Sequence, residues 1–277
     1  MRTTFIVSLG LIIFMLFIWF FVSFTKTERT ITYFPIDETK EFSKASTILS
    51  FDDETKVLYW KTNSETEDNF YLRQDVSLLF INGRLKGILN AWRQRETTIE
   101  QEESLTVDAA SFVQSLTFHH GEWHENDTIT SIQQMTKDEG YILDNYLIKK
   151  PTKKKEIAHQ INETIDEQLH LYWQQLIDFY NLDEQQYKLI SFMQLDQFES
   201  YLGPDISAVT AARITGQLWE GLYKNYILEA ISENSNDYMP VILLANDLSH
   251  LYVLFQLQGE NKQLRQQIQL ENKNVVK

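Results

Sequence analysis

The chain has no cysteine, and this absence excludes several kinds of chemistry. None of its 277 residues offers a thiol, so disulfide bonds, a cysteine nucleophile and a lipid-modified cysteine are excluded. Glycine and proline are scarce, with nine and four residues, which argues against a chain built from loops or repeats. Phosphate-binding, dinucleotide-binding, zinc-protease and serine-hydrolase motifs are also missing. The sequence therefore favours a protein without enzymatic activity.

Positive charge is in short supply as well. The chain carries 25 Lys and Arg against 39 Asp and Glu, which gives a formal net charge of −14. A protein this acidic repels phosphate backbones and anionic lipid headgroups, so we expect no nucleic acid among its partners. Hydrophobic residues make up 43% of the chain and aromatic residues 13%. This composition predicts a folded domain rather than a disordered chain.

One long uncharged stretch stands at the N-terminus. Residues 5–24 contain no charged side chain and are soon followed by Lys26. Twenty helical residues span roughly 30 Å, the thickness of the hydrocarbon core of a bilayer. The stretch is longer than the apolar region of a signal peptide, and bulky residues stand where a signal peptidase needs small ones. We therefore predict an uncleaved signal-anchor: a single transmembrane helix over residues 5–25 in the cell membrane, with the bulk of the chain extracytoplasmic.

The rest of the chain changes its pattern from strand to helix and back to strand. We predict an α+β fold in which the N-terminal transmembrane helix is followed by an antiparallel β-rich part, a helical part and a C-terminal β-hairpin. The expected parts are a short tail (1–4), the transmembrane helix (5–25), a juxtamembrane linker (26–45), the β-rich part (46–148), the helical part with its returning hairpin, packed with the β-rich part (149–260), and a polar tail (261–277).

Local signals place several elements within this plan. Asn82-Gly83 between two apolar runs predicts a two-residue type I′ turn, because both central residues must adopt positive φ. Apolar residues at every third or fourth position predict a helix of about 25 residues ending near Phe179, and another over residues 207–231. Strands at 240–245 and 251–255 are expected to extend the N-terminal sheet. The tail from Lys262 is expected to form an amphipathic helix.

Three of the six histidines lie between residues 119 and 124. On a strand, His120, Glu122 and His124 share one face, and two imidazoles with a carboxylate form a ligand set that zinc accepts. In an extended strand, residues i and i+4 stand roughly 13 Å apart, so a shared zinc ion requires a bend at Gly121. The alternative is a polar hairpin tip, at which Gly121 supplies the turn and the rings lie at the surface.

These observations lead to three hypotheses of function. The first is a single-pass membrane protein whose acidic extracytoplasmic domain acts by protein contacts, as a regulator, an assembly factor or a scaffold, with its partner at the membrane surface. The anchor would raise the effective concentration of the domain near such a partner. The second is a module that binds a ligand or a metal ion through His120, Glu122 and His124. The third is a surface hydrolase that assembles its site from residues far apart in the sequence.

Overall fold

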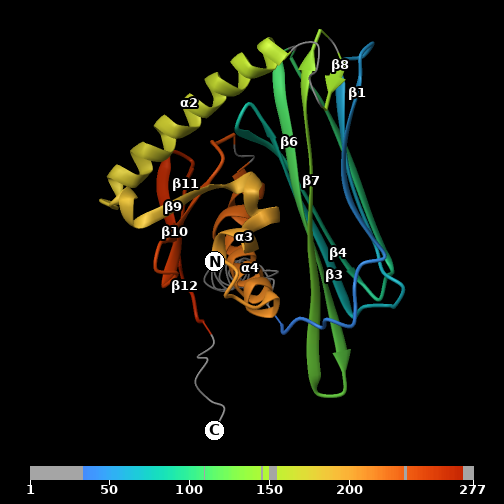
Figure 1. Cartoon of the computed structure of the whole chain (residues 1–277). Coiled ribbons are helices and arrows are strands. Elements are labelled where there is room, and N and C mark those ends of the chain that lie inside the picture. Colours follow the sequence, from blue (N-terminus) through green and yellow to red (C-terminus); the bar gives the residue numbers. More distant parts are fainter. Residues whose placement is uncertain (1–33, 109, 145, 150–154, 234–235, 271–277) are drawn as a thin grey trace, which may run out of the picture. The chain divides into compact units, whose positions relative to one another are not determined.

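The computed structural model describes residues 34–108, 110–144, 146–149, 155–233 and 236–270, which lie in one unit of the chain, Thr32–Lys277. The transmembrane helix predicted over residues 5–25 lies outside the described residues. Among the described residues, no helix is both long and apolar enough to cross a membrane. The described chain is α+β and its sheets are antiparallel (Figure 1), as the sequence predicts.

The N-terminal strands form two sheets that face each other as a sandwich (Figure 1). The three-stranded sheet has the order β1-β2-β5, and the five-stranded sheet has the order β4-β3-β6-β7-β8. An apolar cluster joins the sheets, with Leu49 and Trp60 from the first and Leu79 and Val113 from the second. The strands are β1 (Lys44–Asp52), β2 (Val57–Glu65), β3 (Leu72–Ile81), β4 (Arg84–Gln94), β5 (Thr98–Thr106), β6 (Ser111–Glu125), β7 (Thr128–Leu143) and β8 (Tyr146–Ile148).

The turn predicted at Asn82-Gly83 is confirmed. These two residues join β3 to β4, Ile81 pairs with Arg84, and φ is +50° at Asn82 and +74° at Gly83. Positive φ at both central positions is the type I′ geometry, which glycine adopts without a steric penalty. The turn also contacts the C-terminal half of the chain, because the Met239 N–H donates a hydrogen bond to the Gly83 carbonyl.

The C-terminal half holds a second α-β arrangement. Helix α2 has the predicted position and length, with 25 residues ending at Phe179. The helical stretch predicted over 207–231 is also confirmed, as two α-helices joined by a π-helical turn. The elements are α2 (Lys155–Phe179), η1 (Glu184–Gln186), β9 (Tyr187–Ser191), η2 (Phe192–Gln197), α3 (Phe198–Leu202), α4 (Ala208–Leu222), the π turn η3 (Tyr223–Ile227), α5 (Leu228–Glu233), β10 (Val241–Ala245), β11 (His250–Leu257) and β12 (Glu260–Gln267).

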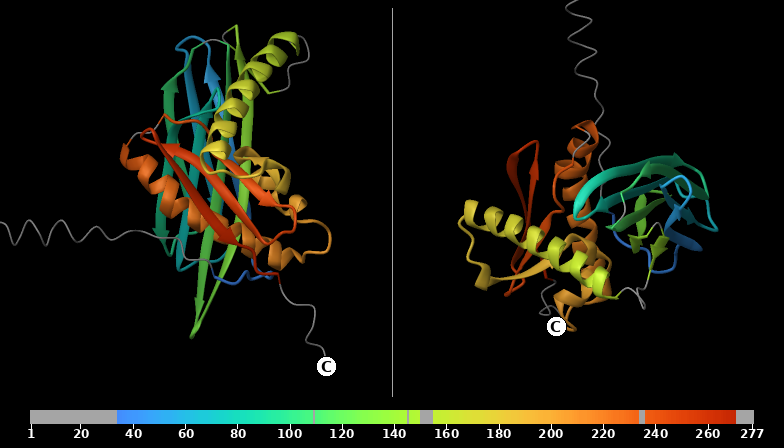
Figure 2. Two further views of the ribbon diagram at one scale, coloured as in Figure 1. Left: turned by 90° about the vertical axis from the view of Figure 1, so that its left-hand side faces the viewer. Right: turned by 90° about the horizontal axis from the view of Figure 1, so that it is seen from above.

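The prediction that the C-terminal strands extend the N-terminal sheet is wrong. They form a sheet of their own with the order β12-β11-β10-β9. The physical reason is the helical layer between the two sheets (Figure 2). Trp219 of α4 stacks on Phe118 of β6 at 4.8 Å between ring centroids, and Tyr226 of the π turn meets Phe255 of β11 at 5.1 Å. These aromatic contacts cover both sheets and keep them apart.

The helix expected from Lys262 onward is wrong over residues 262–267, because residues 260–267 form strand β12; residues 271–277 lie outside the described residues. Gln258 and Gly259 both have positive φ, at +55° and +79°, and they join Leu257 to its pairing partner Glu260. This is a second turn with positive φ at both central residues. It folds a polar segment back along the apolar strand β11, so pairing with a neighbouring strand determines the structure of residues 260–267.

The hairpin tip expected at Gly121 is a third correction. Strand β6 runs through Gly121 in the middle of its pairing with β3 and β7. The turn comes later, between Glu125 and Thr128, which pair with each other. A Cβ at Gly121 would stand 3.0 Å from the Phe70 ring. Glycine is therefore needed for close packing under that ring, and it supplies no turn.

Candidate functional site

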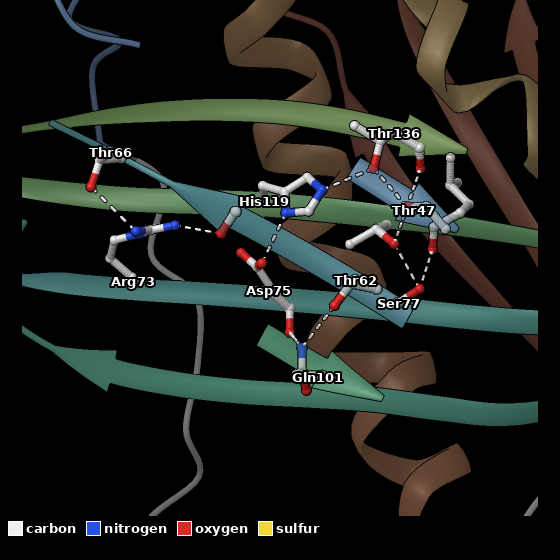
Figure 3. A network of polar contacts seen from close by, with 12 residues as sticks. Thr47, Thr62, Thr66, Arg73, Asp75, Ser77, Gln101, His119 and Thr136 are labelled. Atoms are coloured by element: carbon white, nitrogen blue, oxygen red, sulfur yellow. Dashed lines mark hydrogen bonds and ion pairs between the residues drawn. The ribbon is translucent and has the colours of Figure 1, made fainter. Parts of the chain in front are cut away.

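A network of polar side chains lies inside the sandwich (Figure 3). Asp75 on β3 pairs in register with His119 on β6, so both side chains point toward the three-stranded sheet. Asp75 Oδ2 lies 3.0 Å from His119 Nδ1, and both side chains are fully buried. The other ring nitrogen, Nε2, lies 2.9 Å from the Thr136 hydroxyl of β7. The imidazole therefore lies between the Asp75 carboxylate on one side and the Thr136 hydroxyl on the other.

A chain of hydroxyl groups continues this network. Thr47 of β1 donates to Thr117 of β6 at 2.6 Å, and Thr117 donates to Ser77 of β3 at 2.7 Å. Ser77 also accepts from the Trp60 indole at 3.0 Å. These contacts connect the two sheets through hydrogen bonds at the point where the apolar cluster ends.

Arg73 supplies the positive charge of the interior. Its guanidinium donates to the Ser64 and Thr66 hydroxyls and is fully buried. Burial lowers the pKa of Arg73 below its usual range, and the charge of Asp75 opposes that shift. One buried cation therefore accompanies one buried carboxylate, and the His119 ring lies in close contact with that carboxylate.

The arrangement of Asp75, His119 and Thr136 has the order of a catalytic carboxylate, imidazole and hydroxyl. Catalysis requires a substrate within reach of the hydroxyl and the ring. Asp75 and His119 have no exposed surface, so a substrate cannot meet the pair in this structure. We interpret the network as a structural device that joins the two sheets. The sequence gives a signal for it in retrospect, since Arg73, Asp75 and Ser77 alternate along one strand.

The predicted metal ligands lie on the opposite face of the same sheet. His120 and Glu122 are buried, and His124 is partly exposed. The Glu122 carboxylate reaches both rings, with Nε2 of His120 at 3.6 Å and Nε2 of His124 at 3.2 Å. Tyr71 stacks on the His124 ring at 3.9 Å between centroids. Among the described residues, no group of three His, Asp or Glu side chains has the arrangement of a metal site, so zinc binding stays a prediction.

A groove runs beside helix α2. Its volume is about 300 Å³, and one wall is helical while the other is formed by Asn82 and Ala110 of the sandwich. The helix is held in place by Ala158, which packs against β7, and by Trp173, which donates to the Met239 carbonyl. The helical wall consists of Ile157, Gln160, Ile161, Thr164, Ile165 and Gln168.

The groove continues into an uncharged strip on the outer side of α2, which we call the α2 flank. Three of its four large apolar members are exposed, Ile157 by 44%, Leu171 by 63% and Phe179 by 60%, and the fourth, Ile161, is half-buried. Large apolar side chains exposed on one face of a helix are typical of protein contact surfaces. At 100° per residue its members fall on one side of the helix. The α2 flank comprises Ile157, Ile161, Thr164, Gln168, Leu171, Gln175 and Phe179.

The chain matches no protein-family model, no curated protein and no solved structure. Within the described residues, three features remain that differ in access: the sealed polar interior, the Glu122 contacts and the α2 flank. The flank was missed at the level of sequence because Ile157 and Phe179 continue the buried stripe of the helix. Only the packed structure shows that the apolar stripe of α2 is wider than the part of the helix that the rest of the domain covers.

Proposed function

We propose that the protein is a single-pass membrane protein that acts outside the cytoplasm by binding a partner protein along the α2 flank, as a regulator, an assembly factor or a scaffold. The observation that carries this proposal is the row of exposed apolar side chains, of which Leu171 and Phe179 are the most exposed. Large apolar anchors beside a groove are the usual energetic centres of protein interfaces. The anchor proposed over residues 5–25 confines this surface to the membrane, where it meets partners at a raised effective concentration.

The side of the membrane on which the domain lies can be tested with a single introduced cysteine, because the chain has no cysteine of its own. Ser104 is exposed on β5, far from the α2 flank in the sequence. A Ser104→Cys variant in intact cells should react with a membrane-impermeant maleimide before lysis. Reaction only after lysis would place the domain in the cytoplasm and overturn the extracytoplasmic part of the proposal.

Binding at the flank can be tested by the protection of a cysteine. We expect Gln168→Cys to react more slowly with maleimide in intact cells than in the purified full-length protein, because a bound partner covers it. Ser50→Cys, exposed on β1, is the matched control and should react equally in both settings. If the ratio of the reaction rate in cells to the rate in the purified protein is the same for both cysteines, no partner is bound at α2.

Zinc binding by His120, Glu122 and His124 is the second candidate function. One observation favours it: His120 Nε2 is buried without a hydrogen-bond partner and faces the carboxylate that also reaches His124. Zinc should then raise the melting temperature of the wild-type protein and leave a His120→Ala/His124→Ala variant unchanged. His170→Ala, at an exposed histidine of α2, is the control. A wild-type protein with no shift in zinc would end this proposal.

A further inference from the structure

The residues of the α2 flank recur with the spacing of a helix–helix seam. Successive members are separated by four, three, four, three, four and four residues, from Ile157 to Phe179. This is close to the heptad spacing at which the side chains of one helix insert between those of another. The seam runs from Ile157 to Phe179 along this helix, so it offers a facing helix roughly 33 Å of contact.

One side of this seam already lies against the rest of the domain. The neighbouring helical positions Ala158, Ile165 and Leu169 are buried, and Asn82 stands across the groove. A facing helix would settle between α2 and the β3–β4 turn, with α2 on one side and the sandwich on the other. The row follows one helix over its whole length and exposes no strand edge, so a helix fits this surface better than an added strand.

The open side of the seam carries negative charge only. Glu156, Glu167 and Asp178 are exposed and recur every eleven residues, so they differ by about 20° around the helix and stand roughly 16 Å apart along it. No Lys or Arg lies between residues 156 and 179. A second copy of this helix or an anionic lipid surface would be repelled, whereas Lys or Arg side chains on a partner would be attracted.

We propose that the α2 flank receives an amphipathic helix of the partner protein, whose apolar seam is bordered by Lys or Arg. This inference rests on the proposed function, because it names the partner for the same surface. The basic residues of the partner meet Glu167 and Asp178, in the middle and at the end of α2. The chain's own lysine-rich stretch at residues 149–155 comes before the N-terminal end of α2, away in the sequence from Glu167 and Asp178.

Two synthetic helical peptides can test the inference. They share one apolar heptad seam, and one carries Lys at the bordering positions while the other carries Glu. Binding to the full chain in zwitterionic nanodiscs is measured by fluorescence anisotropy, with empty nanodiscs subtracted. We expect the Lys peptide to bind at least tenfold more tightly than the Glu peptide, and Glu167→Lys/Asp178→Lys to weaken it about tenfold.

Matched variants separate the two levels of the proposal. Glu103→Lys/Glu125→Lys changes the net charge equally at exposed sites of β5 and β6, and should change the affinity less than twofold. Leu171→Glu should abolish binding of the Lys peptide, while circular dichroism shows an unchanged fold. If Leu171→Glu abolishes binding but the charge reversal at Glu167 and Asp178 has no effect, the α2 flank remains the proposed binding surface. The inference that its partner helix is basic is then overturned. If neither change affects binding, or neither peptide binds, the helix-docking inference is overturned.

Discussion

The central strands β3 and β6 of the five-stranded sheet are largely buried on both faces, but the side chains on the two faces differ in chemistry. Toward the three-stranded sheet, β3 presents Arg73 and Asp75, whose partner His119 comes from β6. Toward the helices, the same strands present Phe80 and Phe118, which meet aromatic rings of η2 and α4. A slip of one residue would exchange the two sets. The polar side chains of the first face therefore help to fix the register, while the second face packs through aromatic rings.

The largest test of this comparison is on the aromatic face. Trp219 is fully buried and its ring lies 4.8 Å from Phe118 and 6.3 Å from Phe192. We expect Trp219→Ala to lower the free energy of unfolding by about 3–5 kcal/mol, because it removes apolar burial and leaves a cavity. Denaturant unfolding of the full chain in detergent measures the change. A loss below about 1 kcal/mol would contradict the account of the helical layer.

The next test breaks the polar face. Asp75→Ala should lower the free energy of unfolding by about 3 kcal/mol, because Arg73 and His119 stay buried without their carboxylate. The double variant Asp75→Ala/His119→Ala should cost clearly less than the sum of the two single changes. Additive losses in the same unfolding experiment would show that Asp75 and His119 are not coupled.

A smaller loss is expected at the hydroxyl chain. Ser77→Ala leaves the Trp60 indole and the Thr117 hydroxyl without their shared partner, which should lower the free energy of unfolding by about 1–2 kcal/mol. Ser50→Ala, at an exposed position of β1, is the control and should change it by less than about 0.5 kcal/mol. Equal losses of stability at the two serines would show that the buried hydroxyl network does not stabilise the fold.

The C-terminal sheet offers a contrast that depends on pH. Burial lowers the pKa of His250, Arg265 lowers it further and Asp247 opposes both. The folded protein therefore binds fewer protons at His250 than the unfolded chain does, so its stability falls as the pH drops through the usual histidine range. We expect the melting temperature to fall less in His250→Gln than in the wild type between pH 7.5 and pH 5.5. An identical fall in both proteins would contradict this assignment.

The smallest effect on stability is expected at the α2 flank. Leu171→Glu should change the free energy of unfolding by less than about 0.5 kcal/mol, because the side chain is 63% exposed and packs little. Ile48→Glu, at a residue 48% exposed on β1, is the matched control. A large loss at Leu171 alone would mean that the flank belongs to the core of the domain and is no free surface.

The sequence predicted the parts of the fold that depend on local signals. Asn82-Gly83 specifies its turn by φ alone, and α2 follows from its apolar period. The polar interior could not be predicted, because Arg73 and Asp75 in a strand resemble residues that face water. Their burial depends on how a second sheet, formed by β1, β2 and β5, packs over β3. Strand β12 was missed for a similar reason: its polar residues fit a surface helix until β11 is placed beside them.

The candidate surface shows the same limit. His120, Glu122 and His124 do share a face, as their spacing predicts, and both histidine rings approach the Glu122 carboxylate. The extent of the α2 flank depends instead on which helical positions the sandwich leaves uncovered. That is a property of packing between parts 70 or more residues apart, such as Asn82 and Ile157, and periodicity along the helix does not contain it.

Photo-crosslinking in intact cells tests the central claim most directly. A crosslinking amino acid is placed at Gln168 or Gln175 on the α2 flank, or at Ser50 on β1 as the control. The account predicts one adduct of discrete size from both flank positions and none from Ser50. It also predicts that Phe179→Glu removes this adduct without lowering the amount of protein. Equal adducts at all three positions, or an adduct unaffected by Phe179→Glu, would contradict the claim that this protein binds its partner along α2.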